Sequence, residues 1–219
     1  MENSFFLPKG TEGRKKNIMV LHIQGLILIV VLIIMLSSSL GIIGRTVLSE
    51  VVYRSGILDP GAEQELTELM QSGNMYALMT YTYEPSPAVE LFQNAMKVWS
   101  VLGYIVTFAS LAGAIYLVIL MKKRIAMILD DPAPLENPVR VKKGAFVWLG
   151  FLLGAYGGHL FAMKKKKAWI YLGLGILGIW IPIFFFYTSG ISFADAFLAC
   201  FIEKDAYGFI EMEDYPHWL

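Results

Sequence analysis

The chain has 219 residues, of which 56% are hydrophobic and 16% are charged, and its formal net charge is zero. Soluble domains carry about 25% charged residues, so this composition indicates a membrane protein, and the balanced charge argues against nucleic acid as a partner. A single cysteine, Cys200, excludes an internal disulfide and a cysteine-rich metal site.

Four charge-free blocks predict four transmembrane helices, because a bilayer core of about 30 Å needs about 20 apolar residues per helix. The blocks are Ile18 to Ile43, Val98 to Met121, Ala145 to Met163 and Ala168 to Gly190, and the third is the shortest. We interpret the first block as a retained anchor, since it exceeds the apolar core of a signal peptide, about 7–15 residues. We therefore predict an all-α, multi-pass integral membrane protein.

The first half of the chain is predicted to be a cytoplasmic tail, residues 1–17, followed by two long membrane helices within residues 18–121. The first helix is expected to continue to Ser55, and Pro60 is suited to the start of a short helix ending near Gln71. Residues 75–83 are expected to be extended or interfacial, and a long helix is predicted from Pro87 through Met121. Residues 45–97 would then form a small extracytoplasmic helical insert.

The second half begins with residues 122–143, which combine basic residues with three prolines and are expected to form a cytoplasmic linker without regular helix. A membrane hairpin is expected over residues 144–190. In residues 191–219, Ser192 is a possible N-cap of an interfacial amphipathic helix, and an acidic tail follows. The end of this tail is expected either to be tucked against a partner surface or to be partly disordered.

Small residues are predicted to form packing seams. Gly150, Gly154 and Gly158 recur at four-residue intervals, and Gly173, Gly175 and Gly178 offer a second smooth surface. Small residues let membrane helices approach closely, so we predict a tight transmembrane hairpin in which Gly154 contacts the 173–178 face. The alternative explanation is that glycine is simply frequent in membrane helices. Small residues at 37–44 and 100–113 form similar faces on the first two membrane helices. We expect these faces either to pack on each other or to bind a partner.

The segment Trp148 to Trp180 resembles the TM2 domain family. Residues 154–161, which include Tyr156, His159 and Phe161, resemble its G-x-G-x-H-x-F-Y-like segment, and residues 173–178 resemble its glycine-rich second helix. Leu160 and Ala162 stand where arginine and tyrosine are common. The resemblance is confined to residues 145–190 and implies an architecture of two short paired membrane helices, with little chemistry.

The distribution of Lys and Arg predicts a cytoplasmic amino terminus, because basic residues in short loops favour the cytoplasm; we expect the plasma membrane. Four crossings place Lys164 to Lys167 on the opposite side, against this rule. Either the other basic segments overrule these lysines, or residues 145–163 form a protein-buried re-entrant turn. Four crossings are the preferred prediction.

No catalytic, cofactor-binding or metal site is predicted. His22, His159 and His217 lack metal-site spacing, and none of the four blocks contains an acidic residue, Asp195 being the nearest. A polar residue in a membrane helix is a functional-site hypothesis, but we expect His22 and His159 to lie near the interface.

These features favour a non-enzymatic accessory or scaffold subunit of a larger membrane complex, in contact with the lipid bilayer and with partner proteins or copies of itself. The alternative is a self-associating pore or transporter subunit. A third, weaker hypothesis is an enzyme or signalling component that acts through the cytoplasmic linker.

Overall fold

A computed structural model describes residues 11–54, 60–80, 85–135 and 138–213. The helices are α1 (Thr11–Arg54), α2 (Pro60–Gln71), α3 (Met75–Thr80), α4 (Pro87–Leu129), α5 (Lys143–Leu153), the 3-10 helix η1 (Gly154–Tyr156), α6 (Gly158–Ala162), α7 (Ala168–Leu177) and α8 (Pro182–Phe201); the strands are β1 (Pro138–Lys142) and β2 (Phe209–Glu213). Residues 1–10 of the expected tail and residues 214–219 lie outside the described residues.

Three helices of the described chain, α1, α4 and α8, are long and apolar enough to cross a membrane, which identifies a membrane protein. Helices α5 and α7 have 11 and 10 residues, or about 15 Å each at 1.5 Å per residue. Each is therefore too short to cross a hydrocarbon core of about 30 Å alone. The third apolar block, predicted as one helix, is divided into α5, η1 and α6.

The chain forms two compact units, one of residues Met1–Leu32 and Ala112–Leu219 and the other of residues Ile33–Leu111. In the second unit, α1 ends at Arg54 and α2 covers Pro60–Gln71, close to the predicted bounds. The segment expected to be extended or interfacial begins with helix α3. The small-residue faces of α1 and α4 in this unit form hydrogen bonds with each other. Ser38 Oγ donates to Gly103 O at 2.8 Å and accepts from Thr107 Oγ1 at 3.1 Å.

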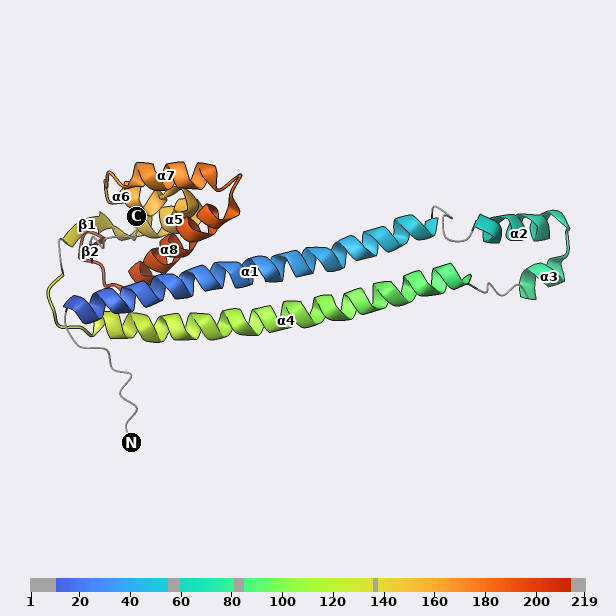
Figure 1. Cartoon of the computed structure of the whole chain (residues 1–219), viewed down its shortest axis with the longest axis horizontal. Coiled ribbons are helices and arrows are strands. Elements are labelled where there is room, and N and C mark those ends of the chain that lie inside the picture. The colour runs from blue at the N-terminus through green and yellow to red at the C-terminus, as the bar shows by residue number, and fades with distance from the viewer. Residues whose placement is uncertain (1–10, 55–59, 81–84, 136–137, 214–219) are drawn as a thin grey trace, which may run out of the picture. The chain divides into compact units, whose positions relative to one another are not determined.

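In the first unit, helices α5 to α8 pack together with the two strands beside them (Figure 1). The polypeptide turns between η1 and α6 because Gly157 adopts a positive φ of 76°, a conformation that glycine adopts without steric cost. A Cβ on Gly157 would also lie 2.6 Å from Tyr171 Cβ. This glycine therefore ends one helical segment and lets α7 approach the turn.

Helix α8 begins ten residues earlier than the amphipathic helix expected to start at Ser192. Pro182 occupies its first turn and Ile181 is extended, as expected because proline disfavours helical backbone in the residue before it. Ser192 is thus no N-cap: it lies in the middle of α8 and is fully buried. On the same helix, Ala196 packs on Gly150 of α5 and Phe193 packs edge to face on Phe151.

The linker and the acidic tail pair with each other. Strands β1 and β2 are antiparallel, with Arg140 opposite Glu211 and Val141 opposite Ile210. Val141, Ile210 and Met212 are buried, so alternate residues of both strands face the core. Helix α4 extends to Leu129, so the expected linker begins later than residue 122. The acidic tail packs on its own chain through residue 213.

Candidate functional site

Helices α1 and α8 approach each other closely at two glycines. A Cβ on Gly25 would lie 2.5 Å from Gly190 O, and a Cβ on Gly190 would lie 2.6 Å from Leu26 Cα. Only glycine allows this backbone separation at both positions. The close approach brings polar side chains one to two turns away on each helix within bonding distance.

Asp195 of α8 lies between two histidines. Its Oδ1 is 2.8 Å from His22 Nε2 on α1, and its Oδ2 is 3.4 Å from His159 Nε2 on α6. Asp195 is 5% exposed and His159 is 0% exposed. Three segments far apart in the sequence thus contribute to one buried ionisable cluster. Its central residue, Asp195, lies on α8, a helix apolar enough to cross a membrane.

Ser192 connects this cluster to α5. Ser192 Oγ donates to Gly150 O at 3.1 Å and lies 2.6 Å from His159 Nδ1. The Ser192 hydroxyl therefore helps to hold the His159 ring beside the Asp195 carboxylate. Burying a carboxylate without polar partners costs free energy, and the two histidines supply such partners to Asp195.

A second buried polar cluster joins the ends of α1, α4 and β2. The Arg14 guanidinium donates to the backbone oxygens of Asp131, Ala133 and Pro134. It also lies 3.6 Å from the Asp131 carboxylate and 3.7 Å from that of Glu213. With its fork of donors directed at several acceptors, this arginine holds the start of the first helix against the linker and the tail.

Two members of the first set of predicted packing glycines, Gly150 and Gly154, contact α8. A Cβ on Gly150 would lie 2.6 Å from Ala196 Cβ, and one on Gly154 would lie 2.5 Å from Ser192 Oγ. Gly158 lies against Leu149 O and Leu153 of the preceding helix, where its Cβ would lie at 2.5 Å and 2.8 Å. The three heavy atoms nearest to a Cβ on Gly154 all belong to Ser192 of α8, whereas the expected contact of Gly154 is with residues 173–178.

The second set behaves differently at each position. A Cβ on Gly175 would overlap Ala155 O, so α7 does pack closely on η1, one residue beyond Gly154. Gly178 lies against Phe185, at the turn into α8, whereas a Cβ on Gly173 would meet no atom of the described residues within 4 Å. Gly175 and Gly178 therefore lie in close contacts, whereas the space beside Gly173 is open among the described residues.

The three predicted motif residues lie in different surroundings. His159 is the most buried, and its ring meets Phe146 and Tyr171 edge to face. Tyr156 is half-buried on η1 beside Gly175. Phe161 is partly exposed and packs edge to face on Trp169 with centroids 5.4 Å apart. Of the three, only His159 belongs to the buried cluster.

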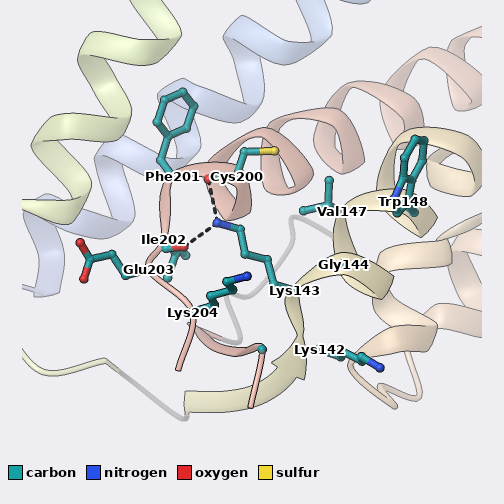
Figure 2. A pocket seen from close by; sticks show the side chains of 11 residues that line it. Lys142, Lys143, Gly144, Val147, Trp148, Cys200, Phe201, Ile202, Glu203 and Lys204 are labelled. Carbon is teal, nitrogen blue, oxygen red and sulfur yellow. Dashed lines mark hydrogen bonds between the residues drawn. The ribbon is translucent and has the colours of Figure 1, made fainter. Parts of the chain in front are cut away.

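An open pocket of about 890 Å³ lies between the start of α5 and the end of α8 (Figure 2). Lys143 Nζ donates to Cys200 O and Ile202 O, both at 2.8 Å, and so joins the two helices. Lys142, Lys204 and Trp148 also line the pocket and are exposed.

The turn next to this pocket is fixed by Asp205. Its carboxylate accepts the backbone N–H groups of Tyr207 and Phe209 at 2.9 Å and 2.8 Å and pairs with Arg140. The Phe209 N–H bond, followed by the Arg140 bond, lowers the pKa of Asp205 below its ordinary value. The ionised carboxylate therefore supports the entry into β2.

Sequence reasoning identified His22, His159 and Asp195 separately but did not bring them together. The available signal was their polarity within charge-poor helices, whereas their contact depends on the approach of Gly25 and Gly190. Within the described ranges, no group of three His, Cys, Asp or Glu side chains is placed to hold a metal ion. Comparisons with protein-family models, with curated proteins and with solved structures give no match for this chain.

Proposed function

We propose that the protein is a non-enzymatic accessory or scaffold subunit of a larger membrane complex, and that residues 45–97 contact a partner protein outside the membrane. The observation that carries this proposal is that large apolar side chains are exposed in parts of the chain outside the four charge-free blocks. Val51, Met75, Tyr76 and Leu91 are 59%, 66%, 79% and 73% exposed. Exposed apolar side chains outside the bilayer are typical of protein interaction surfaces.

The buried cluster supports a structural role for the ionisable residues. His22, His159, Asp195 and Ser192 are all buried and interact across α1, α6 and α8. A buried polar network of this kind specifies one arrangement of helices, because any shift leaves charged or polar groups unsatisfied. We assign these residues to bracing the helices of the first unit.

The proposal includes a cytoplasmic amino terminus in the plasma membrane and a re-entrant α5–η1–α6 segment. Helix α6 turns back along α5, since Gly158 packs on Leu149 and His159 meets Phe146. The connection from α6 to α7, which carries Lys164 to Lys167, lies at the same end of this helical group as β1 (Figure 1). This arrangement supports re-entry over the four crossings preferred from the sequence.

Re-entry also removes the conflict in the charge distribution. With Lys164 to Lys167 on the cytoplasmic side, Arg45, Arg54 and Lys97 are the only basic residues of the sequence on the other side, out of 18 Lys and Arg. This distribution agrees with the preference of Lys and Arg for cytoplasmic segments. We retain the TM2-like architecture for residues 145–190 as a proposal, with the glycine turn as its tip.

Site-specific photocrosslinking tests the scaffold function. A benzoylphenylalanine at Leu91 of the full chain, irradiated in intact cells, should give a crosslink to one protein of different sequence, identified by mass spectrometry. The control position is Phe108, which is 67% exposed within the charge-free part of α4 and should contact lipid. A crosslink from Leu91 only to this same chain, or none above the Phe108 background, would contradict the proposal.

A self-associating transporter subunit is the second candidate function, and the position of Asp195 favours it. Transporters carry ionisable groups at membrane depth, and Asp195 lies within a candidate membrane span. The serine faces support it less, because Ser38 is engaged by Gly103 and Thr107. Light scattering of the protein in mild detergent separates the two functions: a monodisperse homo-oligomer without foreign subunits favours the transporter.

A further inference from the structure

We propose that the pocket between α5 and α8 binds the phosphate-bearing headgroup of an anionic phospholipid. The pocket lies at the carboxyl end of α8, a helix long enough to cross the membrane. The proposed site is independent of the scaffold function, because it belongs to the first unit and uses none of the residues assigned to partner binding.

The charge of the pocket suits an anion. Three lysines, Lys142, Lys143 and Lys204, line it against one carboxylate, Glu203. Figure 2 shows the side chain of Glu203 directed away from Lys204. The Lys143 ammonium already donates to two backbone oxygens at the end of α8. Within the described residues, the side chains of Lys142 and Lys204 have no hydrogen bond or ion pair. Two cations are therefore available to a ligand phosphate: Lys204 beside Lys143, and Lys142, whose flexible side chain is directed away from them in Figure 2 and would turn toward the ligand.

The apolar part of the lining suits a lipid better than a free phosphate. Val147, Trp148 and Phe201 line the same pocket, and Trp148 is 66% exposed. Tryptophan is enriched at the level of lipid headgroups, where its ring contacts acyl chains and its N–H remains near water. Basic pockets beside membrane helices on the cytoplasmic side bind anionic headgroups.

The geometry of the pocket is fixed before any ligand binds. Lys143 bridges the start of α5 to two backbone oxygens at the end of α8, and Lys143 N donates to Gly208 O at 3.0 Å. The volume of about 890 Å³ falls within the range of small-molecule sites, about 300–1,000 Å³. A headgroup and the first carbons of its acyl chains fit a site of this size.

Binding to the full chain in detergent tests the proposal. Microscale thermophoresis with dioctanoyl phosphatidylglycerol, dioctanoyl phosphatidylcholine and inorganic phosphate should show saturable binding of phosphatidylglycerol and at least about tenfold weaker binding of the other two. Equal affinity for the two lipids would overturn the charge recognition. Inorganic phosphate binding as tightly as phosphatidylglycerol would overturn the lipid as ligand.

Matched variants locate the site. Lys142→Gln with Lys204→Gln should weaken phosphatidylglycerol binding by about tenfold or more. The control, Lys164→Gln with Lys166→Gln, removes the same charge outside the pocket lining and should retain the parent affinity. Unchanged affinity in the first pair, or an equal loss in both pairs, would overturn the assignment. Both lysines of the first pair are exposed, and the comparison of ligands on the parent protein decides independently of the variants.

Discussion

Asp195 Oδ1 lies 2.8 Å from His22 Nε2, although the two residues are 173 positions apart in the chain. The contact joins α8, the last candidate membrane helix, to α1, the first. Both residues are buried, so neither water nor a lipid headgroup competes for this contact. Substitutions at the pair therefore test whether the polar cluster stabilises the first unit.

Replacing Asp195 by asparagine should destabilise the protein strongly. The change leaves His22 and His159 facing an amide in place of a carboxylate, and breaking a buried ion pair by removing one partner costs about 3–5 kcal/mol. Thermal unfolding in detergent measures the loss. Asp205→Asn, at an exposed carboxylate, is the control and should have a much smaller effect. A double-mutant cycle with His22→Gln should show coupling; additive effects would refute the pairing.

The packing glycines should separate into two groups. Gly154→Ala should lower the unfolding temperature, since its Cβ would lie 2.5 Å from Ser192 Oγ, and overpacking costs about 1–3 kcal/mol. Gly173→Ala should be neutral or stabilising, because nothing described lies within 4 Å and alanine favours helix by about 1 kcal/mol over glycine. Thermal unfolding of both variants in the same detergent is the measurement. An equal response at both positions would contradict the observed packing on α8.

Cysteine labelling should place Lys164 to Lys167 on the cytoplasmic side. In a Cys200→Ser background, Lys165→Cys should resist an impermeant thiol reagent added outside intact cells and react after permeabilisation. Gln71→Cys, in the proposed extracytoplasmic insert, should react without permeabilisation. The readout is the mass shift of the labelled protein. Labelling of Lys165→Cys from outside would exclude re-entry and restore the four-crossing topology.

The Asp205 carboxyl should titrate below its ordinary pKa of 3.8. A lowered folded-state pKa means that its contribution to stability is present above the unfolded pKa and is lost as the pH falls through the folded pKa. Carbon-13 NMR of aspartate-labelled protein in micelles measures the midpoint, with Asp205→Asn for assignment. Arg140→Gln should move the midpoint upward, because it removes one of the bonds to the ionised form. A midpoint unchanged by Arg140→Gln would show that the backbone N–H groups alone lower it.

The sequence by itself determined the elements whose signals are local. Long charge-free runs define α1 and α4, and Pro60 and Pro87 begin the helices expected at those positions. Apolar length and proline geometry act within a few residues, so they can be recognised without knowledge of the fold. The same reasoning pointed to Gly150 and Gly154, and the atoms nearest to both glycines lie on α8.

Only the tertiary structure decided which segments meet. The strand pair Pro138–Lys142 with Phe209–Glu213 joins two short segments whose alternation is too brief to recognise alone. The division of 145–163 depends on Gly157, which has a positive φ and whose missing side chain leaves room for Tyr171 of α7. His22, Asp195 and His159 form one cluster because two glycines let α1 and α8 approach. Contacts between residues more than a hundred positions apart follow from packing in three dimensions, which no local pattern encodes.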